Sequence, residues 1–347
     1  MRIAQIAPLY ESVPPRFYGG TERIVSFLTE ELVAMGHRVT LFASGDSRTH
    51  AHLVCGCPEA LRLRGDVLDP IAHHVAHLRR VMDHAREFDV IHNHMDYLGF
   101  PLAAASLRPV VTTLHGRLDI PDLVPVFDAF PEVELLSISD AQREPLPGVR
   151  FRSTVQHGLP RDLLRAGDGS GGYLAFLGRM SPEKRPDAAI RIARRVGMPL
   201  RMAAKVDDAD KEFFDAVVRP LLDTSLIEFV GEIDDAHKEQ FLGEARALVM
   251  PIDWPEPFGI VMIEALACGT PVVARVCGSV PEIIDDGVTG FVCANEDEMA
   301  RAVSRIDEIE RRRCRLEFES RFTAAHMARA YVRVYHDVLG NWERGAA

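Results

Sequence analysis

Several common features are missing from the sequence, and each absence excludes a class of protein. No uninterrupted apolar run is long enough to cross a bilayer, so we expect no membrane-spanning helix. Acidic residues outnumber basic ones by 51 to 40, and the formal net charge of -11 argues against a nucleic-acid-binding protein, whose surface should be basic. The six cysteines are scattered apart from Cys55 and Cys57, and no pair has zinc-ribbon spacing. A reduced, cytoplasmic protein is the simplest expectation.

The composition is that of a globular protein, with 47% hydrophobic and 26% charged residues. A length of 347 residues favours two domains, each with its own core. The first residues, Met1 to Ile6, have a strand pattern rather than that of a signal peptide. Four glycines, an aspartate and a serine follow Arg165 and predict a flexible linker at residues 166–172. We therefore expect one domain at residues 1–165 and another at residues 173–323.

A strand, a loop, a helix and a second strand open the chain, and this order predicts a parallel sheet. Residues 2–8 have the apolar pattern of a buried strand, and residues 39–43 form the next one. Between them, Gly19 and Gly20 precede an amphipathic helix, whose first amides are a plausible cradle for a phosphate. Many such loops bind nothing. This one is not a Gly-x-Gly-x-x-Gly fingerprint, which argues against a nicotinamide-dependent dehydrogenase.

Histidines gather at two places in the first domain. Those of the predicted helix at residues 70–87 should be surface polar residues rather than metal ligands, because no acidic or cysteine partner is suitably spaced. His92 and His94 leave a predicted strand, and His115 ends the next one beside Gly116. Loops at the C-terminal ends of parallel strands line ligand clefts, so these three histidines are candidate ligand contacts. The alternative is that each is a hydrogen-bonded histidine of the core.

Two cations stand between the first strand and the first helix of the second domain. Arg179 and Lys184 follow a predicted strand at residues 173–177 and precede a predicted helix at residues 186–196. Arginine offers a forked contact to phosphate and lysine a point charge, which suits a diphosphate. The spacing is not that of a Walker A loop. The alternative is a basic turn on the surface.

The residues from Glu256 to Val273 combine a loop, a short apolar helix and a buried strand. Pro257 suits the first turn of that helix, and Gly269 ends it. Glu264 is unusual, because it lies inside the apolar run, where a buried carboxylate needs hydrogen-bond donors. Glu256 lies just before the helix, whose amides favour an anion. Two acids can accept hydrogen bonds from hydroxyls, and helix amides can bind a negative group, so the arrangement suits a sugar nucleotide. The alternative is that both acids form structural ion pairs.

This stretch resembles the donor-site signature of the retaining GT-B glycosyltransferases of family 4, the glycosyl transferases group 1. The shared pattern is Glu-x7-Glu around Pro-Phe-Gly, followed by Glu-Ala-x-Ala-x-Gly-x-Pro-Val-Val. Gly178-Arg179 with Lys184, and Thr-x-His-Gly ending at Gly116, match further motifs of that family. The resemblance implies an α/β protein of two doubly wound, Rossmann-like domains that face each other across a cleft. It also implies that residues 324–347 form a helix that packs back on the first domain.

The resemblance assigns catalytic roles to four residues. Arg179 and Lys184 would clamp the donor diphosphate in place of a metal ion, so neither a metal nor a cofactor is expected. Glu256 would hold the hydroxyls of the sugar. His115 would hydrogen-bond the transferred sugar, and its backbone carbonyl would favour the positive charge that develops there.

Other residues would complete the donor and acceptor sites. Glu264 would hold the ribose, while His92 and His94 would lie near the cleft floor with an acceptor-binding or structural role. Val206 and Ile233, at two strand exits, are candidate contacts to the base. The remaining implied donor contacts are Gly19, Gly20, Phe258, Gly259 and Ile260.

The sequence therefore predicts a retaining, metal-independent glycosyltransferase that moves a hexose from a nucleotide sugar to an unidentified acceptor hydroxyl. A UDP-hexose is favoured as donor, and GDP-mannose stays open. One alternative is a nucleotide-sugar epimerase of the same fold, which would isomerise its substrate without an acceptor. Another is a nucleotide-sugar-binding protein without activity. Nucleic acid is not an expected partner, and peripheral membrane contact and the oligomeric state stay open.

Overall fold

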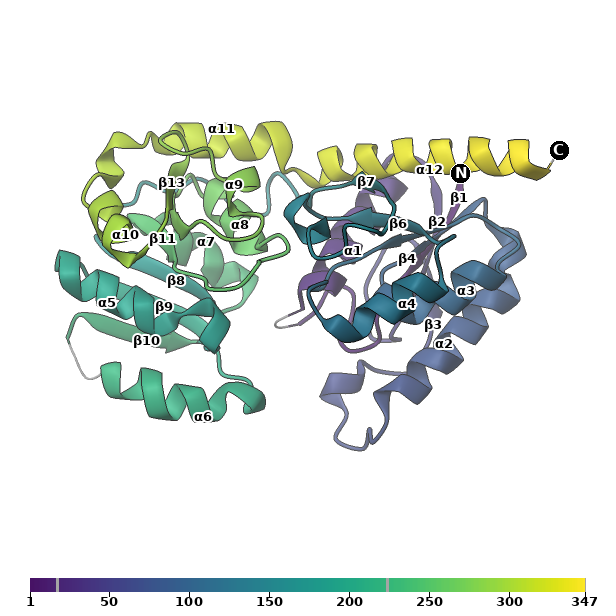
Figure 1. Cartoon of the computed structure of the whole chain (residues 1–347), viewed down its shortest axis with the longest axis horizontal. Coiled ribbons are helices and arrows are strands. Elements are labelled where there is room, and N and C mark those ends of the chain that lie inside the picture. The colour runs from purple at the N-terminus through teal and green to yellow at the C-terminus, as the bar shows by residue number, and fades with distance from the viewer. Residues whose placement is uncertain (17–18, 223–224, 347) are drawn as a thin grey trace. The chain divides into compact units, whose positions relative to one another are not determined.

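The computed structural model describes residues 1–16, 19–222 and 225–346, which fold into two compact units. The first unit comprises Met1–Pro160 and the residues from Ala324 onward, and the second comprises Arg161–Thr323. Figure 1 shows a sheet in each unit with helices packed against it. None of the helices in the described residues combines the length and hydropathy needed to cross a bilayer.

The first unit is built on a parallel sheet of seven strands in the order β3-β2-β1-β4-β5-β6-β7. Its inner strands are largely buried because helices cover the sheet, and each contains apolar or β-branched residues. The strand β3 is more exposed and was not predicted from the sequence. The strands are β1 (Arg2–Ile6), β2 (Arg38–Ala43), β3 (His52–Cys55), β4 (Val90–Asn93), β5 (Val110–Thr113), β6 (Glu134–Ser137) and β7 (Phe151–Thr154).

Helices from both ends of the chain cover this sheet. The last helix, α12, packs against the first, α1. Tyr331 and Tyr335 of α12 are fully buried, which anchors the C-terminal segment in the first unit. The α-helices of this unit are α1 (Gly20–Ala34), α2 (Pro70–His84), α3 (Phe100–Ala105), α4 (Val124–Ala129) and α12 (Ala324–Ala346).

The second unit is a parallel sheet of six strands in the order β10-β9-β8-β11-β12-β13. The strands are β8 (Leu174–Arg179), β9 (Leu200–Lys205), β10 (Ile227–Gly231), β11 (Ala247–Met250), β12 (Val272–Arg275) and β13 (Gly290–Cys293). The helices are α5 (Pro186–Val196), α6 (Lys211–Phe213), α7 (Asp235–Gly243), α8 (Ile260–Ala267), α9 (Val280–Ile283), α10 (Glu296–Val303) and α11 (Arg311–Arg321). The predicted class, two doubly wound α/β domains, is confirmed.

The segment predicted to be a linker is part of the second unit. Residues 166–172 are hydrogen-bonded to it: Gly169 N–H donates to Gly243 O at 3.0 Å, and the Arg311 guanidinium donates to Gly167 O at 3.1 Å. A side chain at Gly167 would meet Gly243 O at 2.3 Å, so this glycine serves close backbone packing. A glycine-rich composition suits both a flexible linker and a tightly packed backbone, so the sequence did not distinguish between them. The units divide at Pro160–Arg161 instead.

Each sheet has one place where the strand order reverses direction. In the first unit it lies between β1 and β4, and in the second between β8 and β11. In doubly wound sheets, ligands bind beyond the carboxyl ends of the strands at this reversal. The loops that follow these four strands are therefore where a site is expected.

Candidate functional site

The two predicted cations follow β8, beside the reversal in the second sheet. Arg179 is the last residue of β8, and Lys184 ends the 3-10 turn Pro182–Lys184. The Arg179 guanidinium donates to Glu183 Oε1 at 2.7 Å and lies 3.6 Å from an oxygen of Asp210 and 3.9 Å from one of Asp207. Arg179 is thus held by acids of its own unit.

Lys184 has a different partner, the carboxylate of Glu256 on the loop after β11. The Lys184 ammonium donates to Glu256 Oε2, and the indole N–H of Trp254 donates to the same oxygen at 2.9 Å. Lys184 Nζ also lies 5.0 Å from the centre of the Trp254 ring, within the range of a cation–π contact. Glu256 Oε1 makes no hydrogen bond to any residue that the structure describes. One oxygen of this acid is therefore occupied, and the other is open to a ligand.

Glu264 repeats this arrangement inside α8. Its side chain is only 5% exposed, and its Oε1 accepts from Lys238 Nζ at 2.7 Å. The sequence-based alternative of a structural ion pair is thus partly right, and the partner is a lysine of α7. No hydrogen bond to Glu264 Oε2 occurs within the described part of the chain.

The loop between the two acids is firmly braced. The helix α8 begins at Ile260, behind Gly259 in a left-handed conformation (φ +76°), so the prediction that Pro257 lies in its first turn was wrong. Ser279 donates from its amide to Glu256 O at 3.0 Å and from its hydroxyl to Phe258 O at 2.8 Å. The loop after β12 thereby fixes the approach to α8, whose first amides have no partner within the helix.

Val206 and Ile233 lie at the same edge of the sheet. Val206 directly follows β9, and Ile233 comes two residues after β10. Both side chains are half-buried. Because all six strands are parallel, these two residues, the cations and the loop of Glu256 follow carboxyl ends on one side of the second sheet.

In the first unit, Gly19 caps α1 in the extended conformation and Gly20 begins the helix. A side chain at Gly19 would meet Pro15 at 2.8 Å, which explains the need for glycine. Sequence reasoning missed Glu22 in the first turn of this helix. Glu22 is buried, and burial raises the pKa of its carboxyl to about 7, with the charge of Glu11 adding to the effect. An acid this close to a glycine pair was visible in the sequence, but its burial was not.

His94 and His115 are brought together after β4 and β5. His94 Nδ1 lies 2.9 Å from His115 Nε2, and His94 Nε2 lies 2.7 Å from Gln5 Oε1. The His157 ring stacks on that of His115 at 5.3 Å. Burial lowers the pKa of His115 to about 3, so its imidazole is neutral at pH 7.

His92 is part of the framework instead. It is fully buried within β4, with Nδ1 2.7 Å from the Tyr335 hydroxyl and Nε2 2.8 Å from Thr113 Oγ1. Both ring nitrogens are occupied, so of the two predicted roles the structure leaves the structural one. The alternation of side chains along a strand places His92 and His94 on the same face, but the sequence does not tell where the strand ends.

A further residue at this edge, Asp96, escaped sequence analysis. Asp96 has a left-handed backbone (φ 47°), and its Oδ1 accepts from the His115 backbone N–H at 2.8 Å. Burial raises the pKa of its carboxyl to about 6, although the amides of His115 and Gly116 oppose this. Asp96 thus holds the backbone of the His115–Gly116 turn.

Two of the four histidines of α2 do not lie where the sequence suggested. His74 and His77 are buried rather than on the surface. His74 Nε2 accepts from Leu9 N–H at 3.0 Å, and the His77 ring packs edge-on against Phe42 at 6.4 Å. No group of three potential metal ligands occurs among the described residues. The helix turns its histidine side inward because Val81 on the same face joins the core.

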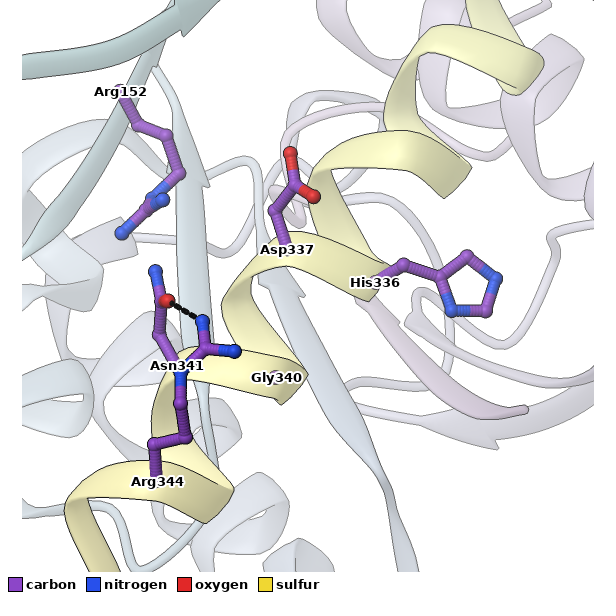
Figure 2. Close-up of a pocket in the computed structure, with 6 residues that line it drawn as sticks. All are labelled: Arg152, His336, Asp337, Gly340, Asn341 and Arg344. Atoms are coloured by element: carbon purple, nitrogen blue, oxygen red, sulfur yellow. Dashed lines mark hydrogen bonds between the residues drawn. The ribbon is translucent and has the colours of Figure 1, made fainter.

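A pocket of about 280 Å³ on the first unit is a separate feature (Figure 2). It holds none of the predicted site residues. Arg152 in its wall is already paired with Glu134 at 2.5 and 2.6 Å, and Arg344 donates to Asn341 Oδ1 at 2.5 Å. We assign it no role. Its lining residues are Arg152, His336, Asp337, Gly340, Asn341 and Arg344.

Two family models match this chain. The model described as "Glycosyl transferases group 1" matches residues 168–325, and "Glycosyltransferase Family 4" matches residues 18–147. Among curated proteins, D-inositol 3-phosphate glycosyltransferase of Frankia alni is 30% identical over 240 residues, covering 65% of this chain and 55% of that protein. The protein of the same name from Mycolicibacterium smegmatis is 29% identical over 204 residues, covering 56% and 45%. The chain thus matches about half the length of these relatives.

Solved structures share the fold across nearly the whole chain. Sucrose-phosphate synthase from Thermosynechococcus elongatus has a TM-score of 0.79 at 20% identity and covers 98% of this chain and 99% of its own. The Anabaena protein HepE in complex with UDP-glucose has a TM-score of 0.73 at 20% identity and covers 97% and 100%. The group 1 model covers all strands of the second sheet, and the Family 4 model covers β2 to β6 of the first. Together the two models span most of the sequence. The chain belongs to the group 1 glycosyltransferases of family 4, with the GT-B fold.

Proposed function

We propose that the protein is a glycosyltransferase that moves a hexose from a nucleotide sugar, in the first instance a UDP-hexose, to an acceptor hydroxyl. One observation carries the proposal. Glu256 and Glu264, eight positions apart on the braced segment before and inside α8, each hold one carboxylate oxygen on an internal lysine and leave the other open. Two fixed acceptors beside free helix amides suit a ligand that has hydroxyls on either side of a diphosphate.

The names of the relatives support the same class of reaction. The curated relatives are D-inositol 3-phosphate glycosyltransferases, and HepE was solved with UDP-glucose and with UDP. A uridine nucleotide is therefore our first choice of donor, and GDP-mannose is the second. An inositol phosphate is the first acceptor to try.

In this proposal the second unit holds the donor. Glu256 Oε1 would accept from hydroxyls of the hexose and Glu264 Oε2 from those of the ribose. Arg179 and Lys184 would turn from their present acids to the leaving diphosphate, and the amides before α8 would add to the stabilisation of its charge. These cations would do the work of a metal ion, so we propose a metal-independent reaction without a cofactor.

His115 of the first unit would contact the transferred hexose. We propose retention of configuration because the chain belongs to a family whose signature predicts it. Val206 and Ile233 would flank the base, and Gly19 with Gly20 would face the diphosphate. The six cysteines are all unpaired, which fits a reducing compartment such as the cytoplasm.

The test begins with a thermal-shift panel of UDP, GDP, ADP and their sugars. A ligand at a hundred times its Kd stabilises the native state by about 2.7 kcal/mol, so the correct nucleotide should stand out. The protein should then hydrolyse that nucleotide sugar slowly and transfer its sugar to a suitable acceptor. Lys184→Ala should lose both responses, while Arg344→Ala, at the separate pocket, should keep them.

Three results would count against the proposal. If no nucleotide raises the melting temperature, the donor site is wrong. If the donor binds but is never hydrolysed or transferred, the protein is a binding protein. If it interconverts two nucleotide sugars without an acceptor, it is an epimerase.

A further inference from the structure

A continuous chain of hydrogen bonds runs through the first unit and centres on Gln5 of β1. On one side, Gln5 Nε2 donates to the Tyr335 hydroxyl at 3.1 Å. On the other, Gln5 Oε1 lies 2.7 Å from His94 Nε2, and His94 Nδ1 lies 2.9 Å from His115 Nε2. The chain thereby links the C-terminal helix to the histidine that we propose contacts the sugar.

The amide of Gln5 sets the direction of every bond along its histidine arm. Because Gln5 Oε1 can only accept, His94 Nε2 must carry the proton. Burial lowers the pKa of His94 well below its ordinary value, so the ring is neutral and its Nδ1 is an acceptor. His115 Nε2 must then be the donor to His94. A neutral His115 is left with an unprotonated Nδ1.

The tyrosine arm agrees with this direction. The Tyr335 hydroxyl, which accepts from Gln5, donates to His92 Nδ1 at 2.7 Å. His92 Nε2 then donates to Thr113 Oγ1 at 2.8 Å, and the Thr113 hydroxyl donates to Tyr331 at 3.1 Å. No two donors and no two acceptors face each other along either arm.

The free end of the chain is His115 Nδ1. This atom is buried and has no hydrogen-bond partner among the described residues. An acceptor without a partner is less costly than a buried N–H without one, which again favours the unprotonated form. The ring itself is held in place by the backbone bond to Asp96 and by the stacked His157.

We infer that Gln5 and His94 are positioning residues that hold His115 in its Nε2–H tautomer, so that its Nδ1 accepts a hydrogen bond from a hydroxyl of the donor sugar. The hydrogen bond to the donor sugar rests on the proposed function, whereas the tautomer of His115 does not depend on it. The site would select a ligand that presents a hydroxyl here, because an ether or carbonyl oxygen cannot donate.

Nitrogen NMR of protein labelled with ¹⁵N-histidine tests the tautomer directly. Long-range correlations distinguish a protonated ring nitrogen from an unprotonated one, and His115→Asn assigns the signal. We expect an unprotonated Nδ1 in the wild type, with a shift of its resonance when UDP-glucose is added and a smaller shift with UDP alone. A protonated Nδ1 in the wild type would overturn the inference.

Two tyrosines on one helix give a matched pair of variants. Tyr335→Phe removes the partner of Gln5 Nε2 and should allow a mixture of His115 tautomers. Tyr331→Phe, at the far end of the same tyrosine arm, should leave a single tautomer. Gln5→Met should have the effect of Tyr335→Phe and raise KM for the donor about tenfold, the value of about one good hydrogen bond, with UDP affinity unchanged.

A single unaltered tautomer in both Gln5→Met and Tyr335→Phe would show that the network does not position His115. Failure of the proposed function would look different. In that case neither UDP nor UDP-glucose would raise the melting temperature, while the tautomers would still follow Gln5. If Gln5→Met does not fold, the wild-type spectrum and the tyrosine pair decide the question.

Discussion

Removing Lys238 would separate the two roles of Glu264, as an ion-pair partner and as a ligand contact. The Lys238 ammonium lies 2.7 Å from Glu264 Oε1, and their side chains are 14% and 5% exposed. Removing one partner of a buried pair costs about 3–5 kcal/mol, and the lysine's remaining exposure favours the lower end. A loss of about 3 kcal/mol lowers Tm by about 6–12 °C for a domain of this size. Lys238→Met keeps the packing of the stem and removes only the charge.

The companion variants complete a double-mutant cycle. Glu264→Gln alone should cost less, about 1 kcal/mol, because the freed ammonium reaches water while the amide still accepts. The double variant Lys238→Met/Glu264→Gln should recover most of the loss of Lys238→Met, because no unpaired charge remains buried. Thermal melts of the four proteins give the coupling energy.

Calorimetric titration of the same proteins with UDP then tests the ligand role. Lys238→Met keeps the carboxylate and its open Oε2, so it should bind UDP nearly as well as the wild type at a temperature where it is folded. Both proteins that carry the Glu264→Gln substitution should bind more weakly, since an amide accepts a ribose hydroxyl less strongly than a carboxylate. UDP affinity that is equal in all four proteins would refute the ribose role and leave Glu264 as a structural acid. A melting temperature unchanged in Lys238→Met would refute the cost of about 3 kcal/mol expected for breaking the Lys238–Glu264 ion pair.

Three further predictions concern other residues. Trp254→Phe keeps a ring beside Lys184 but removes the N–H hydrogen bond to Glu256. The kcat/KM for the donor should therefore fall about tenfold while the affinity for UDP is unchanged. An equal loss of kcat/KM and of UDP affinity would contradict a sugar-specific role. Arg179→Ala should lower kcat by about two orders of magnitude, the scale of one charge-stabilising donor, and an intact rate would remove it from the mechanism. Burial lowers the pKa of His77 from 6.5 to about 4, so the unfolded chain takes up a proton in this window and the folded chain does not; stability should fall as the pH falls from 6.5 toward 4. Urea titrations of His77→Leu should show a shallower fall, by up to about 1.4 kcal/mol per pH unit, and equal slopes in His77→Leu and wild type would contradict this.

Sequence reasoning recovered the parts of the fold that short-range patterns encode. The strand–helix alternation predicts a parallel sheet because helix and strand periods differ, and many of the buried strands contain short apolar runs. It missed β3 at His52–Cys55 and β13 at Gly290–Cys293, which are short and have no extended apolar run. The strand β3 is surrounded by polar residues, and β13 directly follows a turn.

The sequence named the residues of the candidate site but not the contacts that the structure gives them. The sequence singled out Glu264 because an acid in an apolar helix needs donors, yet Lys238 as its donor is 26 positions away. The same holds for Gln5 and Tyr335, which meet across 330 positions. Side-chain pairs between distant elements depend on the packed structure, and no local pattern in the sequence announces them.

The chain crosses from one unit to the other only at Pro160–Arg161 and at Thr323–Ala324. On the first unit, Leu159 O accepts from Ala324 N–H at 2.7 Å, so the two crossings leave it side by side. The two units are therefore joined by these two connections, and the glycine-rich segment at residues 166–172 is not one of them. The glycines at 167–171 are fastened within their own unit, and replacing them by alanine should weaken that unit's packing rather than stiffen a hinge.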